Sequence, residues 1–347
     1  MAKALVGVDI GNNSLRAVEV MDAAGSKPSI VRYHQVALPE GAAQSGEVVE
    51  LNTVAAAFRT LWAEGGFKSK DVVLGMGNQR VLARDLSVPK ASLAQIRESL
   101  PFQVQDLLLV PVADAILDFY PVSETPSETG PVVNGLLVAA VKSSVLSNVK
   151  AAELAGLNPV GVDLIPFALT RVHLRGAAAR GTIALIDVGC TTTSVIIATN
   201  GIPQFVRIIP AGGDDISRAL ITRLEVTHPQ AEQIKRSLGL SSVGVAPEHL
   251  PAVEAIYEAS SQILTSLRNT LSYFVNARQQ EGIGRIVLSG GGARLRGFDS
   301  ALSEITKLQV TTGNGFGDIQ VSKTAAKTEV PTDSMTVALG LALGASA

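Results

Sequence analysis

A short sequence pattern occurs twice in this chain, at positions separated by about half of its length. The first copy is VGVDIGNNSLRAVEV at residues 6–20, and the second is LIDVGCTTTSVII at residues 185–197. Aligning the copies pairs Asp9 with Asp187. β-Branched runs favour strands, and the small polar residues between them favour a turn. Each copy therefore predicts a β-hairpin, and the duplication predicts two related halves that face each other.

The composition of the two turns is suited to binding phosphate. Gly11 aligns with Gly189, and both turns present backbone N–H groups and hydroxyls without bulky side chains. Such groups bind phosphate oxygens. Asp9 and Asp187 end their first strands and would face each other, where two carboxylates can hold a hydrated magnesium ion that bridges to a nucleotide. The alternative is a pair of ordinary Asp-Gly hairpins, and the matched flanks favour the phosphate interpretation.

A triple glycine forms the third candidate element. Gly290-Gly291-Gly292 directly follows the apolar strand pattern of residues 286–289. Because glycine has no Cβ, such a segment lets a planar ring lie against the backbone. A flexible loop is the alternative interpretation. About a hundred residues after Asp187, the segment fits an adenosine-binding strand–turn–helix.

Length and composition limit the classes of fold and function. A chain of 347 residues exceeds the size at which a single core usually stops growing, and 46% apolar residues can fill two lobes. The formal net charge of −2 gives no basic excess for nucleic acid. One cysteine excludes an intrachain disulfide, and the four histidines lack ligand spacing, so we interpret them as structural or surface residues. The longest apolar stretches fall short of the roughly 20 residues that span a bilayer, which predicts a soluble protein.

The strand and helix patterns divide the chain into four parts. Strands at 81–88, 115–122 and 135–141 with helices at 92–100 and 144–156 indicate a small α/β insert, and a long amphipathic helix is expected at 251–280. The expected parts are a first-lobe core at 1–84 with 156–180 and 335–347, the insert at 85–155, a second-lobe core at 181–214 and 283–334, and a helical subdomain at 215–282.

The two turns and the triple glycine, in this order, resemble the superfamily of actin, sugar kinases and heat-shock chaperone ATPases. The resemblance implies a duplicated actin-like (ribonuclease H-like) α/β fold that binds ATP with magnesium, the metal being held by Asp9 and Asp187. It also implies that Glu232 and Lys235, on one helix, contact ribose and base, although a solvated helix face is the alternative. The implied nucleotide-binding residues are Asp9, Gly11, Asn12, Asn13, Ser14, Asp187, Gly189, Cys190, Thr191, Thr192, Gly212, Gly213, Glu232, Lys235, Gly290, Gly291, Gly292 and Arg294.

Within the superfamily the chain resembles the PilM family of type IV pilus assembly over nearly its whole length, including residues 134–142, 151–157 and 162–169. The insert is similar to the subdomain that this family shares with the division protein FtsA. FtsA-like proteins end in an amphipathic membrane-binding helix, whereas residues 338–343 here are uniformly apolar. The resemblance implies a cytoplasmic scaffold, peripheral at the inner face of the cell membrane. Its implied partners are an N-terminal PilN-like peptide and other pilus platform proteins, without nucleic acid or direct membrane insertion.

One residue departs from the superfamily pattern. Chaperones of the superfamily carry a glutamate that orients the attacking water directly before a proline, and Ile165 stands there in this chain. Isoleucine cannot polarise water, so we expect slow or absent hydrolysis and assign no catalytic residue. Two alternatives stay open. One is a small-molecule kinase with Asp85 or Asp163 as base, and the other is an FtsA-like polymer-forming protein.

Overall fold

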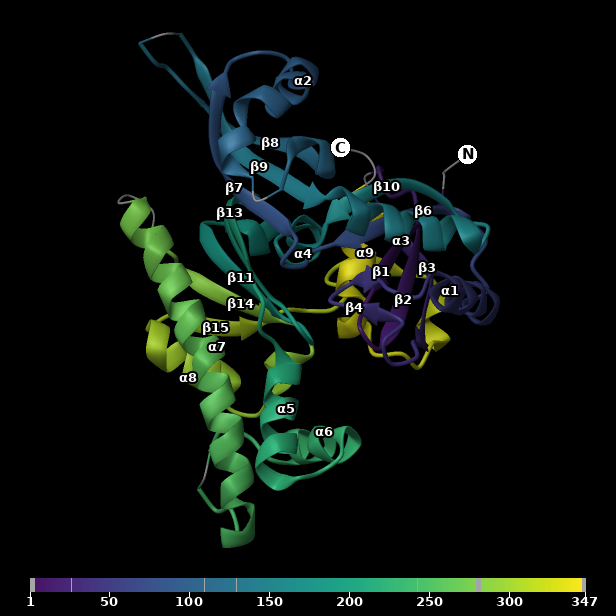
Figure 1. Ribbon diagram of the computed structural model, residues 1–347, viewed down its shortest axis with the longest axis vertical. Helices are drawn as coiled ribbons and strands as arrows, with labels where there is room; N and C mark the ends of the chain where they lie inside the picture. Colours follow the sequence, from purple (N-terminus) through teal and green to yellow (C-terminus); the bar gives the residue numbers. More distant parts are fainter. Residues whose placement is uncertain are drawn as a thin grey trace.

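The computed structural model describes residues 4–25, 27–108, 110–128, 130–241, 243–278 and 282–344 (Figure 1). Its central feature is a pair of sheets with the same arrangement of strands. In each sheet the first strand of the sequence repeat is central. Two strands continue from it as an antiparallel meander on one side, and two parallel strands lie on the other side. The duplicated topology predicted from the repeat is therefore confirmed.

The first sheet has the strand order β10-β6-β1-β2-β3-β16 and the second has the order β13-β12-β11-β14-β15. The strands of the first sheet are β1 (Ala4–Ile10), β2 (Ser14–Met21), β3 (Ser29–Ala37), β6 (Asp71–Met76), β10 (Asn158–Leu164) and β16 (Gln320–Val321). Those of the second sheet are β11 (Thr182–Val188), β12 (Thr193–Thr199), β13 (Ile202–Ile209), β14 (Arg285–Ser289) and β15 (Gln309–Thr312).

The two repeat hairpins share the same turn hydrogen bond. The Gly11 N–H donates to the Ser14 carbonyl at 2.9 Å, and the Gly189 N–H donates to the Thr192 carbonyl, also at 2.9 Å. A backbone bond over three residues closes a tight turn between antiparallel strands. The alignment of Gly11 with Gly189, made from sequence, is thus an equivalence in space, and it extends to Ser14 and Thr192.

Helices cover both faces of the first sheet. On one face, α1 (Leu51–Gly65) and α3 (Lys142–Leu154) share a core with Val6 and Val8 of β1. On the other face, α4 (Ile165–His173) and α9 (Thr336–Leu343) pack against Leu5. Successive side chains of a strand point to opposite faces, which explains this division. Helix α4 also contributes Leu169 to a core with Leu185 of β11, so it lies between the two sheets.

The closing helix α9 approaches β1 so closely that one strand position must be glycine. A Cβ placed on Gly7 would lie 1.9 Å from the carbonyl oxygen of Ala338 and 2.5 Å from the amide nitrogen of Ala342. Both atoms belong to the α9 backbone and cannot rotate away. Gly7 is therefore the contact through which the last helix of the chain is seated on the first strand.

In the second lobe, helices pack against the second sheet and share one continuous core with it. Its helices are α5 (Gly213–Leu224), α6 (His228–Ser237), α7 (Leu250–Ala277) and α8 (Phe298–Thr306). Ile256 and Leu267 of α7 pack with Ile186 of β11, Leu220 of α5 and Phe298 of α8. Figure 1 shows α7 running along the outer side of the second sheet, with α5 and α6 beyond one end of that sheet.

The insert forms a separate three-stranded antiparallel sheet with the order β7-β9-β8 (Figure 1). Its elements are β7 (Val81–Pro89), α2 (Leu93–Gln103), β8 (Ala115–Thr125) and β9 (Val132–Val141). Leu100 of α2 packs against Phe119 and Leu137 of this sheet. Helix α3, which was expected within the insert, packs on α1 through Ala151 and Ala152 and on the insert strands through Val145. The expected boundaries stay predictions.

None of the helices in the described ranges is both long and apolar enough to cross a membrane.

Candidate functional site

Two carboxylates, one from each repeat hairpin, lie close enough to influence each other electrostatically. Asp9, at the end of β1, is buried, and its Oδ2 accepts from Arg16 Nη1 at 2.8 Å. Burial raises the pKa of Asp187 to about 6; a hydrogen bond from Ser289 lowers it, and the negative charge of Asp9 raises it further. The electrostatic influence of Asp9 on Asp187 places both residues at one site, although they come from different lobes. A pair of carboxylates is suited to a cation that also takes phosphate oxygens as ligands.

The second turn, the start of α5 and the triple glycine converge at one point. The Gly213 N–H donates to the Gly189 carbonyl at 2.9 Å. A Cβ on Gly212 would lie 2.5 Å from the Cys190 carbonyl oxygen, and one on Gly292 would lie 3.2 Å from the Gly189 carbonyl oxygen. The backbones of three segments far apart in sequence therefore touch where side chains would not fit.

The triple glycine is a tight backbone crossing, which excludes the flexible-loop interpretation. Gly290 has φ of +90°, a region that favours glycine. A Cβ there would lie 2.4 Å from the carbonyl oxygen of Val188, at the end of β11. The segment is thus held against the second hairpin, and Gly291 beside this contact is exposed.

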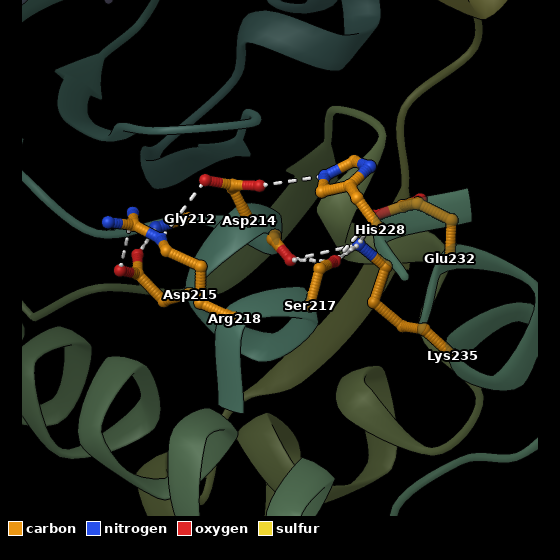
Figure 2. A network of polar contacts seen from close by, with 9 residues as sticks. Gly212, Asp214, Asp215, Ser217, Arg218, His228, Glu232 and Lys235 are labelled. Atoms are coloured by element: carbon orange, nitrogen blue, oxygen red, sulfur yellow. Dashed lines mark hydrogen bonds and ion pairs between the residues drawn. The ribbon is translucent and has the colours of Figure 1, made fainter. Parts of the chain in front are cut away.

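Glu232 and Lys235 form a bonded network with the start of α5, as Figure 2 shows. Lys235 Nζ donates to the Gly213 carbonyl at 2.9 Å, to Ser217 Oγ at 2.7 Å and to Glu232 Oε1 at 2.5 Å. The side chains of Glu232 and Lys235 are only 28% and 15% exposed. Burial raises the pKa of Glu232, but the hydrogen bonds from Lys235 and Ser217 outweigh it and lower the pKa overall. The two residues are therefore not a freely solvated helix face.

The outer part of the same network was not predicted from sequence. Asp214 lies 3.1 Å from Arg218 Nε and 3.2 Å from His228 Nε2, and Asp215 accepts from the Gly212 N–H at 2.7 Å (Figure 2). Acidic residues in the first turn of a helix bond its free N–H groups and favour its dipole. Two aspartates directly after Gly212-Gly213 were the available sequence signal.

Cys190 marks the place where the two lobes meet. Burial raises the pKa of its thiol, Asp214 and Glu232 raise it further, and Lys235 and Arg16 lower it. Arg16 belongs to the first hairpin, whereas Lys235 belongs to α6 of the second lobe. The charges of Arg16, from the first hairpin, and of Lys235, from α6, therefore both act on this one thiol. Arg16 is a further residue that sequence reasoning missed.

Asn12 and Arg294, also predicted to bind nucleotide, have structural partners. Asn12 Oδ1 accepts from the Ser45 N–H at 2.7 Å and so holds the small hairpin of β4 (Ala43–Gln44) and β5 (Glu47–Val48) beside the first turn. Arg294 is ion-paired with Asp333, which lies just before α9. These partners do not overturn the predicted roles, but any ligand at Arg294 has to compete with Asp333.

A groove of about 820 Å³ lies between the insert and the first lobe, lined by residues other than those of the two turns. The edge strand β10 of the first sheet contributes Val160 and Val162, which are 47% and 38% exposed, and the insert contributes Ile116 of β8. Two ion pairs lie along the groove, Arg97–Asp118 at 2.6 Å and Arg171–Asp163 at 2.5 Å. Exposed aliphatic side chains beside two sheet edges are the features that an extended peptide recognises.

Comparison with known proteins gives the family. A family model described as type IV pilus assembly protein PilM matches residues 7–346. The chain belongs to the PilM family. A solved structure of a PilM–PilN type IV pilus biogenesis complex contains a chain 26% identical to it, with a TM-score of 0.81 over 99% of this chain and 98% of that one.

More distant structures show the actin-like fold of this PilM-family chain. EutJ from Carboxydothermus hydrogenoformans is 16% identical with a TM-score of 0.57, covering 99% of this chain and 90% of that chain. MreB5 of Spiroplasma citri bound to AMPPNP is 11% identical with a TM-score of 0.54, covering 98% and 95%. The actin-like fold class predicted from sequence is therefore confirmed.

Relatives by sequence include cell division proteins FtsA. FtsA of Bacillus subtilis is 22% identical to this chain over 346 residues, and the match covers 88% of this chain and 77% of that FtsA. That of Neisseria meningitidis serogroup B is 26% identical over 196 residues, covering 51% of this chain and 47% of its own. The second match therefore spans about half of the FtsA length.

Proposed function

We propose that this PilM-family chain binds ATP with magnesium in the cleft between its lobes and acts as a scaffold rather than as a rapid ATPase. The observation that supports the nucleotide part is that the second turn, the start of α5, the triple glycine and Lys235 contact one another, while the charge of Asp9 from the first hairpin acts on Asp187. The same fold in MreB5 was solved with AMPPNP and with ADP, which supports the proposal.

The residues present fit magnesium and a nucleotide. Among the described residues no cluster of three or more potential metal ligands occurs, so the protein side is limited to the pair Asp9 and Asp187. Such a pair needs phosphate oxygens and water to complete an octahedral magnesium site. The glycine turns would hold the phosphates, and Glu232, Lys235 and the triple glycine would hold the nucleoside. Bound magnesium would neutralise phosphate charge.

The second part of the proposal is a partner peptide in the groove. We propose that the groove between β8 and β10 binds the N-terminal cytoplasmic segment of a PilN-like membrane protein in an extended conformation. Exposed Val160 and Val162 on a free sheet edge support this, because they offer apolar contacts beside unpaired backbone groups. Such binding would keep a cytoplasmic protein peripheral at the membrane through its partner, next to other pilus platform proteins.

A fluorescent N-terminal peptide of the neighbouring PilN-like protein tests the groove. It should bind the full chain at micromolar concentration, and Val162→Asp should weaken binding at least about 10-fold because an apolar contact is replaced by a charge. Val49→Asp is the matched control, since Val49 is 60% exposed and lies outside the groove lining. Equal losses in both variants, or none in Val162→Asp, would place the partner elsewhere. Deletion of residues 85–155 is a poorer test, because it removes α3 from the first-lobe core.

The kinase and polymer alternatives are less well supported. Asp163 is ion-paired with Arg171 and lines the groove, and Asp85 is ion-paired with Arg278 at 3.3 Å. Neither is a free carboxylate at the glycine turns, as the base of a kinase would have to be. A screen of phosphoryl acceptors tests the kinase, and sedimentation with ATP tests the FtsA-like polymer.

A further inference from the structure

A hydrogen-bonded chain of three side chains runs from α4 to the carboxylate of Asp187. His173, the last residue of α4, places Nε2 3.1 Å from Ser289 Oγ. Ser289 ends β14 at the register position opposite Asp187 of β11, so the two side chains are neighbours across the parallel strand pair, and the Ser289 side chain lowers the pKa of the Asp187 carboxyl by hydrogen bonding. His173 and Ser289 are each only 7% exposed. His173 thus contacts Ser289, which lies 116 positions further along the chain, through one hydroxyl.

The chemistry of the three side chains determines which group donates and which accepts in each hydrogen bond. An ionised carboxylate only accepts hydrogen bonds, so the Ser289 hydroxyl donates to Asp187. The hydroxyl oxygen is then left to accept, and His173 must donate to it from Nε2–H. The other ring nitrogen, Nδ1, is buried without a hydrogen-bond partner among the described residues. Burial lowers the pKa of His173 to about 4, which is consistent with a neutral ring carrying one proton.

A purely apolar role would not require histidine at this position. The orphaned Nδ1 costs free energy that phenylalanine or leucine would avoid. The hydrogen bond at Nε2 offsets this cost, because its N–H holds the Ser289 hydroxyl oriented towards Asp187.

We propose that His173 is a positioning residue of the nucleotide site, which acts through Ser289 to fix the carboxylate of Asp187 for magnesium. The inference rests on the proposed binding of ATP with magnesium. Replacing a residue that orients a metal ligand without touching the metal typically lowers metal affinity about 10- to 100-fold. His173 therefore determines how much magnesium adds to ATP affinity and contributes nothing to metal-free ATP binding.

The experiment is calorimetric titration of the full chain with ATP, once with magnesium and once with EDTA. His173→Phe keeps a ring of similar size without the donor, and Ser289→Ala removes the relay hydroxyl. Both should reduce the gain in affinity from magnesium about 10-fold or more while the affinity in EDTA stays unchanged. The double variant should be no weaker than Ser289→Ala alone, because both changes break one chain.

Two further variants separate positioning from general damage. His173→Gln offers an amide N–H near the place of Nε2 and should recover most of the magnesium gain. Thr170→Val removes a buried hydroxyl of the same helix, which bonds the Pro166 carbonyl at 2.9 Å rather than Ser289, and should leave the gain intact. Should His173→Phe fail to fold, Ser289→Ala and His173→Gln decide the question. A full magnesium gain in Ser289→Ala or His173→Phe overturns the positioning role while the proposed function stands. No MgATP binding by the unmodified chain overturns both.

Discussion

Arg16 Nη1 lies 2.8 Å from Asp9 Oδ2, directly across the first hairpin. The carboxylate predicted to hold magnesium therefore already has a counter-ion. The Nε of Arg16 is buried without a partner among the described residues, so the guanidinium has donors to spare. Magnesium at Asp9 would compete with Arg16, and phosphate oxygens are the natural alternative partners of a displaced guanidinium.

MgATP should therefore raise the melting temperature of the chain, and Asp9→Ala or Asp187→Ala should abolish most of the rise. A ligand at about 100 times its dissociation constant adds about 2.7 kcal/mol to the free energy of unfolding. Differential scanning fluorimetry with millimolar MgATP measures the effect. Asp299→Ala, at an exposed position of α8, is the control that should respond like the unmodified chain. Absence of any shift in the unmodified chain would disprove nucleotide binding.

Hydrolysis should be slow, because Ile165 occupies the position expected to orient water. A Cβ on Gly77 would lie 2.8 Å from Ile165 Cβ, which places this apolar side chain just beyond the end of β6. Ile165→Glu should raise multiple-turnover phosphate release at least about 10-fold, as a positioned acid–base group does, whereas Ile165→Gln should not. Release by the unmodified chain above roughly 1 per second, as in a kinase, would refute the idea.

Replacing His173 should make the chain lose less stability as the pH falls. Burial lowers the pKa of His173 from 6.5 to about 4, so its contribution is complete above pH 6.5 and is lost as the pH falls towards 4. Burial raises the pKa of Asp187 from 3.8 to about 6, which favours the folded state as the pH falls from 6 towards 3.8. The two effects oppose each other in the unmodified chain.

His173→Gln lacks the His173 effect and keeps the effects of Asp187 and of Glu232, whose pKa is lowered. Relative to the unmodified chain, this variant should gain about 3 kcal/mol of unfolding free energy between pH 6.5 and pH 4, at 1.36 kcal/mol for each pKa unit. Urea denaturation at several pH values measures the difference. Parallel curves for the two proteins would show that His173 titrates normally in the folded state.

Gly7→Ala should destabilise the first lobe by about 1–3 kcal/mol or more, because its Cβ would overlap the α9 backbone. Gly161→Ala is the matched control. It also lies in a strand of the first sheet, and a Cβ there would meet no atom within 4 Å. Chemical denaturation compares the two variants, and equal stabilities would contradict the seating of α9 on β1.

Local sequence patterns were sufficient to predict the segments of the candidate nucleotide site. Both hairpins, their matched turns and the glycine segment after β14 follow from period-two alternation and from small residues at the turns, which act over a few residues. The helix around Glu232 and Lys235 was also expected. The hydrogen bonds from Lys235 to Ser217 and to the Gly213 carbonyl were not expected, because these residues belong to another helix.

Only the tertiary structure showed which side chains of distant segments contact one another. The pairs Arg294–Asp333 and His173–Ser289 join residues 39 and 116 positions apart, and no local pattern announces such contacts. The same holds for α3, whose sequence predicts a helix but not that it packs on α1. The sequence by itself determined the duplicated hairpins, because strand and turn propensities are local. The counter-ion of Asp9, the support of Asp187 and the groove beside β10 depend on how distant segments pack, since burial and hydrogen-bond partners exist only once the two lobes have come together.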